Sequence, residues 1–280
     1  MERSELTEIL EGKVREALEA SAKRKKPSQK PGVGATLVAM DCSRRAAYEL
    51  FDDIAKSERY WMMPPEKRAS FEWWRANFDG KMQRVLRDGF GIEENAVADL
   101  RAAGFRIDTH HQGMQYGFAS TSPKSKRTYS GKLDGIIREA PDWFPMQAPA
   151  VLEIKSMNAK KWAEWQRHGI LRSNPSYARQ IWQYQGMMRL HNPALLVGYN
   201  KDTSEYGCEL VPFDEEQFRN LIERAGALVE AADPEDLPRA GVSRDDMMCR
   251  WCPWVERCWG AVEPAGDWTV FAPEWMKADG

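Results

Sequence analysis

Hydrophobic positions recur along the chain with two different periods. A period of three to four residues predicts helices at 5–22, 43–58, 66–88, 92–103, 158–168, 176–191 and 214–232. Short runs rich in branched and aromatic residues predict strands at 106–120, 127–138, 150–157, 194–201 and 205–213. No internal repeat is present. Helices followed by strands, and then helices and strands in alternation, predict an α/β fold in which a central mixed sheet is flanked by helices.

Breaks in the pattern divide the chain into four parts. Residues 1–32 combine the first helix with a basic linker that contains four lysines, two prolines and a terminal glycine. Residues 33–245 form the predicted core. Residues 246–262 are rich in cysteine and tryptophan and predict a small cap, and residues 263–280 form an aromatic tail.

Two strand segments carry the chemistry. The first reads Gly131-Lys132-Leu133-Asp134-Gly135, and the second contains Glu153-Ile154-Lys155. Because side chains alternate along a strand, Glu153 and Lys155 project from one face and Ile154 from the other. Two carboxylates and a lysine suit a site that binds a hard divalent ion and hydrolyses a phosphodiester, although either segment alone also fits an amphipathic strand with solvated charges.

A helix predicted from 176 adds two polar residues. It begins after Asn174-Pro175, and Gln180 and Tyr184 are four residues apart, so they share one face. An amide and a phenol can hydrogen-bond a phosphate or a base, while a purely structural role is common for such a pair.

These segments resemble the PD-(D/E)xK nuclease superfamily and, within it, the RecB-like branch. The matches are GKLDG at 131–135, LEIK at 152–155 and QIWQY at 180–184, with leucine in place of the proline of the superfamily name. Upstream, GFGIE at 89–93 is similar to the first-motif helix, with Glu93 as the metal ligand and Glu94 or Gln83 as alternatives. The resemblance covers residues 33–260 and is strongest to nucleases encoded by tailed bacteriophages.

The resemblance implies a restriction-endonuclease-like core that cleaves DNA. Asp134, Glu153, Glu93 and the Ile154 carbonyl would bind Mg²⁺ or Mn²⁺, and Lys155 would orient or help to deprotonate the attacking water. Gln180 and Tyr184 would contact DNA. The expected activity is exonucleolytic end processing in recombination or repair, with an unidentified recombination or replication protein as a possible partner. The alternatives are a structure-selective endonuclease and a non-catalytic DNA-binding or assembly module of the same fold.

Five cysteines give an independent signal. Cys249, Cys252 and Cys258 form a C-x2-C-x5-C motif, and Cys42 is the candidate for a fourth ligand. RecB-like nucleases with this arrangement hold a 4Fe-4S cluster, which the resemblance therefore implies, and zinc is the alternative. Disulfides are disfavoured in a chain expected to be cytoplasmic. Cys208 is predicted to be a small core residue.

The overall charge leaves DNA binding to local patches. The net charge is −2, and no apolar stretch reaches membrane-spanning length. Basic residues nevertheless surround the motifs: Lys155, Lys160, Lys161, Arg167, Arg172, Arg179 and Arg189, with Lys124, Lys126 and Arg127 in a preceding loop. Residues 214–236 are acidic. This clustering favours a localised nucleic-acid surface, although solvated helix faces also produce it.

Overall fold

The computed structural model describes residue 13 and residues 32–65, 80–250 and 252–260, with side chains described from residue 87 onward in the second of these ranges. Nearly all of the predicted helix 5–22, the linker, most of 66–88 and the tail 263–280 lie outside the described residues. The helices are α2 (Ala35–Val38), α3 (Ser43–Met62), α5 (Gly80–Ala102), α6 (Ala159–His168), α7 (Ile170–Ser173), α8 (Pro175–Met188), α9 (Glu215–Glu230), η1 (Pro234–Asp236), α10 (Met247–Arg250) and α11 (Val255–Trp259). The strands are β1 (Val33–Gly34), β2 (Arg106–Asp108), β3 (His110–His111), β4 (Met114–Gln115), β5 (Gly117–Thr121), β6 (Thr128–Lys132), β7 (Gly135–Glu139), β8 (Ala150–Met157), β9 (Ala194–Asn200) and β10 (Glu205–Val211).

Five of these strands form the central sheet in the order β10-β9-β8-β7-β2. β8 and β9 are parallel because α6, α7 and α8 lie between them and carry the chain back across the sheet, whereas the other neighbours are antiparallel. The predicted α/β architecture, a mixed sheet flanked by helices, is confirmed.

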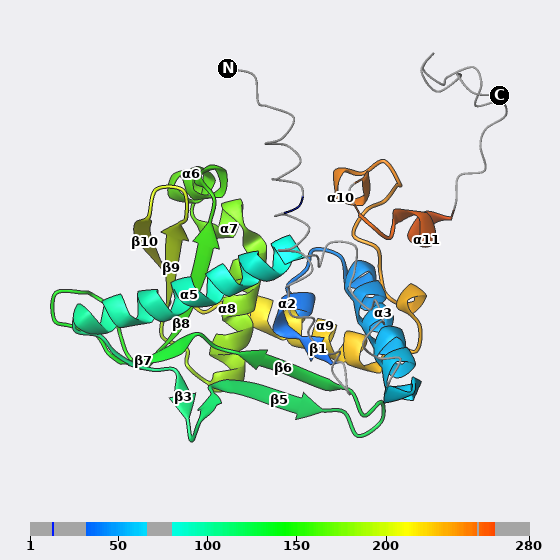
Figure 1. Ribbon diagram of the computed structural model, residues 1–280, viewed down its shortest axis with the longest axis horizontal. Helices are drawn as coiled ribbons and strands as arrows, with labels where there is room; N and C mark the ends of the chain where they lie inside the picture. The colour runs from blue at the N-terminus through cyan, green and yellow to red at the C-terminus, as the bar shows by residue number, and fades with distance from the viewer. Residues whose placement is uncertain (1–12, 14–31, 66–79, 251, 261–280) are drawn as a thin grey trace, which may run out of the picture.

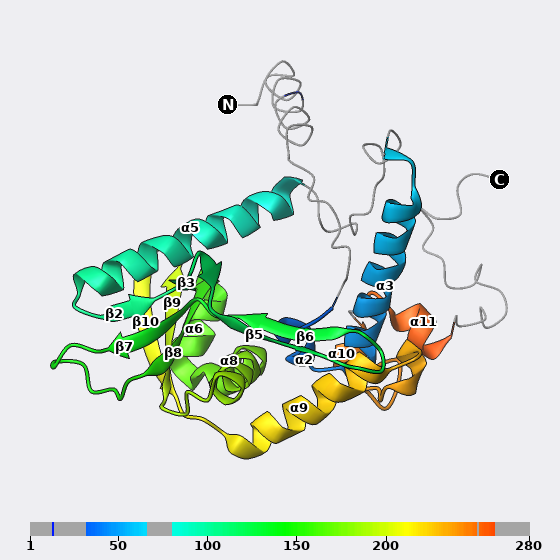
Figure 2. The same cartoon turned by 90° about the horizontal axis from the view of Figure 1, so that it is seen from below.

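Helices cover both faces of this sheet (Figure 2). On one face Leu152 and Ile154 of β8 pack in a hydrophobic cluster with Ala96 and Val97 of α5. On the other face, alternate residues of β8 pack against α8 in a second cluster. β8 is therefore buried on both sides, and a charged side chain within it lies in a position of low solvent access.

A second layer joins the sheet to the cap. β1, β6 and β5 form a smaller sheet whose cluster includes residues of α2, α3 and α9. Beside α3 lie η1 and the short helices α10 and α11 (Figure 1). Arg44 of α3 donates to the Leu237 carbonyl at 2.7 Å, and Tyr48 donates to Glu235 at 2.8 Å. These bonds tie the segment after α9 to α3.

Three predicted boundaries were wrong. The helices predicted on either side of 89–91 are one helix, α5, in which Gly89 and Gly91 have open space where a side chain would stand. The strand predicted at 106–120 is broken into short strands by the turn at Gln112 and Gly113, both with positive φ. The strand predicted at 127–138 is divided at Leu133 and Asp134, because β6 and β7 belong to different sheets.

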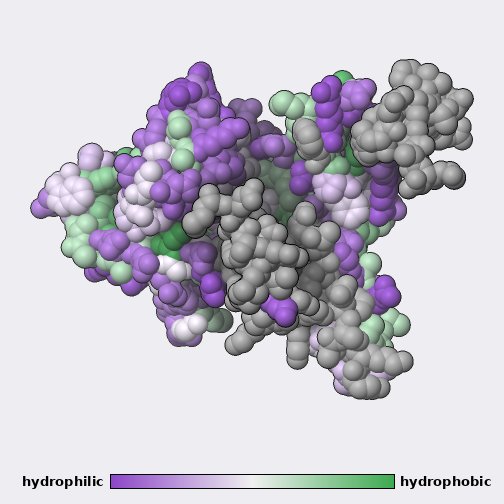
Figure 3. Space-filling view, turned by 45° about the horizontal axis from the view of Figure 1, so that its top comes forward, coloured by the Kyte–Doolittle hydropathy of each residue, from purple (hydrophilic) through white to green (hydrophobic). Residues whose placement is uncertain are grey.

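The visible surface in Figure 3 is mainly hydrophilic, with hydrophobic side chains confined to small patches. Among the described residues, no helix has both the length and the apolar character needed to cross a membrane.

Candidate active site

Glu153 and Lys155 lie on the face of β8 that α8 covers. They share this face with Val151 and Met157, which lie two residues before and two after them and pack in the α8 cluster, so the predicted common orientation is correct. Glu153 is only 1% exposed and forms an ion pair with Lys155. Burial raises the pKa of Glu153 to about 8, with Lys155 opposing the shift and Asp134 adding to it. Burial by itself lowers the pKa of Lys155, but the neighbouring Glu153 and Asp134 carboxylates raise that pKa above its usual value.

The sequence predicted that Asp134 lies on a strand. In the structure Asp134 lies in the bend between β6 and β7. Leu133 anchors this bend because its side chain is fully buried and its N–H donates to the Tyr116 carbonyl at 2.9 Å. Oδ2 of Asp134 accepts a hydrogen bond of 2.7 Å from the N–H of Ile154. Burial raises the pKa of Asp134, whereas Lys155 and this hydrogen bond lower it. The bend therefore holds a second carboxylate beside Glu153.

Glu93 approaches the same site from α5. Burial raises the pKa of Glu93 to about 7, and the negative charge of Asp134 adds to the shift while Lys155 opposes it. Glu94 is exposed, and the side chain of Gln83 lies outside the described part of the chain. Of the alternatives for the first motif that can be compared, Glu93 is therefore the half-buried residue, and its carboxyl interacts electrostatically with Asp134 and Lys155.

Gln180 and Tyr184 share a face of α8, as their spacing predicts, and are bonded to each other. Nε2 of Gln180 donates to the Tyr184 hydroxyl at 2.7 Å. Tyr184 is only 3% exposed, and burial followed by the nearby Glu153 charge raises its pKa. A side chain at Gly131 would stand 2.7 Å from the Tyr184 ring, so this glycine allows the ring to reach the sheet. Gln180 is thus the more accessible of the two.

Tyr177 is a residue that the sequence reasoning missed. Nζ of Lys155 lies 5.3 Å from the centre of its ring, within the range of a cation–π interaction. Tyr177 precedes Gln180 by three residues and Tyr184 by seven, so helical spacing alone places it on the same face. That spacing is the signal that could have identified it.

The carboxylates have the chemistry of a site for a hard divalent cation. Oε2 of Glu153 is buried and has no hydrogen-bond partner among the described residues, and the like charges of Glu93 and Asp134 each raise the pKa of Glu153. A cation would satisfy that oxygen and offset the repulsion. Within the described ranges, no three His, Cys, Asp or Glu side chains are already gathered closely enough to hold a metal ion. The donors therefore fit Mg²⁺ or Mn²⁺ in type, and the structure gives no coordination geometry.

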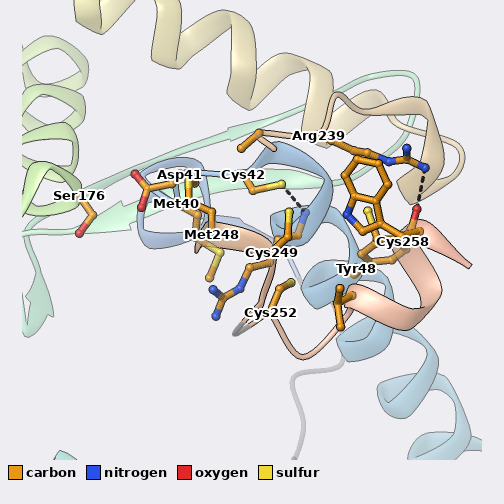
Figure 4. A pocket seen from close by; sticks show the side chains of 14 residues that line it. Met40, Asp41, Cys42, Tyr48, Ser176, Arg239, Met248, Cys249, Cys252 and Cys258 are labelled. Atoms are coloured by element: carbon orange, nitrogen blue, oxygen red, sulfur yellow. Dashed lines mark hydrogen bonds between the residues drawn. The ribbon is translucent and has the colours of Figure 1, made fainter. Parts of the chain in front are cut away.

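Four cysteines line one cavity of about 260 Å³ between α3 and the cap. Figure 4 shows Cys42, Cys249, Cys252 and Cys258 around it. Sγ of Cys42 accepts from the Arg45 N–H at the start of α3, at 3.5 Å. A side chain at Gly241 would stand 2.6 Å from Sγ of Cys249, so the backbone closes tightly around this thiol. The four sulfurs match a thiolate-bound metal centre in ligand type and line one cavity, but among the described residues no three of them lie close enough together to hold a metal ion.

Two other sequence predictions were wrong or incomplete. Cys208 is exposed, because β10 is an edge strand and this residue lines a groove beside α5. Arg127 belongs to the fold and not to a free basic loop: its guanidinium donates to the carbonyls of Val229 and Ala231 and lies 4.8 Å from the Phe51 ring centre.

No protein-family model and no curated protein matches the chain. Among solved structures, the chain is similar to an alkaline exonuclease, LHK-Exo, from Laribacter hongkongensis, with 15% identity, a TM-score of 0.42 and coverage of 76% of this chain and 90% of that one. The complex of LHK-Exo with dAMP gives 14% identity, a TM-score of 0.41 and coverage of 73% and 89%. SSO0001 gives 17% identity, a TM-score of 0.41 and coverage of 89% and 94%. Similarities this low do not fix the activity of this chain.

Proposed function

We propose that this protein is a metal-dependent deoxyribonuclease that hydrolyses phosphodiester bonds. The observation that carries the proposal is the ion pair of buried Glu153 with half-buried Lys155, beside Asp134, which is itself held by the Ile154 N–H. Titratable groups in a strand that is buried on both faces cost free energy of folding, whether they are ionised or held neutral by a raised pKa. A purely structural strand would be more stable with apolar residues there, so the pair is better explained by chemistry than by stability.

Each residue has a defined part in this proposal. Asp134 and Glu153, with Glu93 and the Ile154 carbonyl, would hold Mg²⁺ or Mn²⁺, which when bound supplies Lewis acidity that polarises the phosphodiester and acidifies water. Lys155 stays protonated at neutral pH because its pKa is raised, so it donates a hydrogen bond and offsets the negative charge that develops on the phosphate. Of its two suggested roles, orienting water therefore fits better than deprotonating it.

DNA would approach along α8. Gln180 is half-buried and can donate to a phosphate or a base, whereas buried Tyr184 holds Gln180 in place through their hydrogen bond. Tyr177 would position Lys155. The resemblance to RecB-like nucleases favours exonucleolytic end processing by a phage-encoded enzyme.

The cysteine cavity is proposed to bind one structural metal centre. Cys42, Cys249, Cys252 and Cys258 would hold a 4Fe-4S cluster, as the resemblance implies, with Zn²⁺ as the alternative for the same ligands. Such a centre would join the start of α3 to the cap and close a very long loop, which restricts the unfolded chain.

One experiment tests the activity and its type together. Protein purified without oxygen is incubated with Mg²⁺ or Mn²⁺ and with end-labelled linear or circular DNA, each single-stranded or duplex. Release of mononucleotides or short products from linear DNA, with circular DNA intact, supports an exonuclease. Cleavage of circular DNA identifies an endonuclease, and binding without cleavage under every metal condition identifies a non-catalytic module.

A further inference from the structure

The smaller sheet has one covered face and one open face. Its register and the alternation of side chains place Val33, Phe118 and Tyr129 on the covered face, in the cluster with α3 and α9. The opposite face, which we call the outer face, carries Gly34 of β1, Ala119 and Thr121 of β5, and Thr128, Ser130 and Lys132 of β6. Figure 2 shows α8 and α9 on the covered side and α5 on the other. The outer face is therefore not part of the core.

Short side chains keep the outer face low and open. Ala119, Thr121 and Lys132 are exposed, and a side chain at Gly34 would meet no described atom within 4 Å. Thr121 and Thr128 bond to each other through their hydroxyls at 2.8 Å, so one of these hydroxyl protons stays available for another acceptor. Of the residues on this face, only Lys132 has a long side chain. With no apolar group larger than a methyl, the face lacks the aromatic and aliphatic core of a protein interface.

The segment that contains β3 to β6 has no acidic residue. Residues 109–133 include neither aspartate nor glutamate, although 42 of the 280 residues of the chain are acidic. The segment carries four basic residues, Lys124, Lys126, Arg127 and Lys132. Arg127 bonds to the fold, whereas the three lysines form no ion pair in the described part of the chain. Glu230 accepts a hydrogen bond from Ser122 in the turn after β5, so the acid-free surface begins beyond that turn. Its charge complements a row of phosphates.

The outer face ends at the candidate active site. Lys132 is the last residue of β6, and Leu133 and Asp134 follow it in the bend. Nε2 of Gln115 donates to the Leu133 carbonyl at 2.8 Å, so the bend is fixed to β4 as well as to Tyr116. A nucleic-acid strand that lay along the outer face would therefore reach Asp134 at the end of β6.

We propose that the outer face binds the sugar–phosphate backbone of the DNA that leads into the active site, without reading its bases. This inference rests on the proposed function for the identity of the nucleic acid. The hydroxyls of Thr121, Thr128 and Ser130 donate to phosphate oxygens, and Lys132 supplies positive charge. Small residues at Gly34 and Ala119 let the backbone approach the sheet closely. Contacts of this kind position the substrate and give an affinity that depends on salt and not on sequence.

Charge changes at Ala119 test the outer face without touching the carboxylates. Ala119 is exposed and pairs with Ser130 in the middle of the ribbon of β5 and β6. In EDTA, Ala119→Lys should tighten binding of a labelled duplex oligonucleotide about three- to tenfold and steepen its salt dependence by about one phosphate contact. Ala119→Glu should weaken binding by a similar factor. Ala119→Gln, which has the shape of glutamate without its charge, should bind like wild type. A damaged fold cannot produce the gain expected for Ala119→Lys.

The matched control places the same charges at Ala227. This residue is exposed on α9, on the covered side of the sheet. Ala227→Lys and Ala227→Glu should change binding far less, because salt screens a charge on a distant surface. Equal effects at Ala119 and Ala227 would show that binding responds only to net charge and would overturn the site. Effects at Ala119 that appear with one oligonucleotide sequence and not with another of equal length would contradict contact with the backbone.

Cleavage kinetics separate this inference from the proposed function. With Mg²⁺ or Mn²⁺, Ala119→Glu should raise KM for DNA without changing kcat, because Ala119 does not contact the carboxylates. An unchanged KM in this variant overturns the DNA-binding face and leaves the nuclease standing. Wild-type protein that binds DNA but never cleaves it refutes the nuclease, while the opposite effects of Ala119→Lys and Ala119→Glu still support the face. A change in the mass of the protein in solution for Ala119→Glu, with unaltered DNA binding, assigns the face to a second copy of the chain and overturns the proposal.

Discussion

The main-chain N–H of Ile154 donates a hydrogen bond of 2.7 Å to Oδ2 of Asp134. This bond joins the bend between the two sheets to β8, so the Asp134 carboxylate is fixed next to Glu153 before any ion binds. It also uses a lone pair of only one carboxylate oxygen, which leaves the other available. A site preorganised in this way loses little conformational entropy when a cation binds.

Asp134→Asn should abolish metal binding and cleavage without unfolding the protein. The amide oxygen can still accept from Ile154, so the bend is retained, but the negative charge that attracts a divalent ion is lost. We expect no Mg²⁺ or Mn²⁺ binding by calorimetry and a fall in cleavage rate of about 10³-fold or more. The control is Asp142→Asn, because Asp142 is exposed. Near-normal cleavage by the Asp134→Asn protein would exclude Asp134 as a ligand.

Lys155→Ala should destabilise the metal-free protein in a way that depends on pH. In this variant Glu153 stays buried but loses the neighbouring positive charge of Lys155. The folded-state pKa of Glu153 therefore rises further above the unfolded value near 4.5. An acid whose folded pKa is raised binds more protons when folded, so its penalty is absent below the unfolded pKa and grows as pH rises toward the folded pKa. Wild type carries the same penalty up to its own folded pKa of about 8, so the extra loss of unfolding free energy in the variant should be small near about pH 6 and reach about 1.4 kcal/mol near about pH 9.

Denaturant unfolding in EDTA measures this difference. Lys160→Ala is the matched control, since Lys160 is an exposed lysine on the next helix and its removal should change stability little at either pH. An equal loss for Lys155→Ala at both pH values would show that Glu153 is not the group responsible.

Gly131→Ala should displace the Tyr184 ring. The added methyl would stand 2.7 Å from both Phe118 and Tyr184, closer than van der Waals contact allows. Stability should fall by about 1–3 kcal/mol, and the Gln180–Tyr184 bond should be perturbed, with a rise in KM for DNA. Gly226→Ala is the control because Gly226 lies in α9 with open space around it, and that change should stabilise by up to about 1 kcal/mol. A Gly131→Ala protein of unchanged stability and KM would refute this packing.

Much of the site could be predicted from the sequence, because strands and helices have fixed periods. Glu153 and Lys155 share a face because strands have a period of two, and Gln180 and Tyr184 share a face because helices have a period near four. The position of Asp134 in a bend could not be predicted, since the break at Leu133 depends on β6 and β7 joining different sheets. The exposure of Cys208 depends on β10 being an edge strand, which is likewise set by long-range pairing.

The continuity of α5 also could not be predicted from local sequence. Gly89 and Gly91 suggest a break because glycine weakens isolated helices. Packing of Ala96 and Val97 against the sheet stabilises the helix beyond that intrinsic cost. Local sequence patterns could not predict the pairing of Arg179 with Asp41 either, because these residues are 138 positions apart in the chain.

Loss of any one of the four cavity cysteines should remove the metal centre and destabilise the fold. In Cys42→Ser the link between α3 and the cap is broken, so the melting temperature should fall together with the metal content of anaerobically purified protein. Cys208→Ser is the control because it is remote from the cavity, and it should retain both. Iron and sulfide in the wild type identify a cluster, whereas one zinc without sulfide identifies the alternative. A fully stable Cys42→Ser protein with normal metal content would contradict the shared site.

The most direct test of the central claim is the rate of cleavage of end-labelled DNA with Mg²⁺ or Mn²⁺ and with excess EDTA, measured for wild type, Glu153→Gln and Asp142→Asn. Metal-dependent cleavage should occur in wild type and Asp142→Asn, and should be absent in EDTA and in Glu153→Gln. Cleavage that persists in EDTA, or in a folded Glu153→Gln protein, would contradict the assignment of Glu153 and its neighbours as a metal-dependent nuclease site.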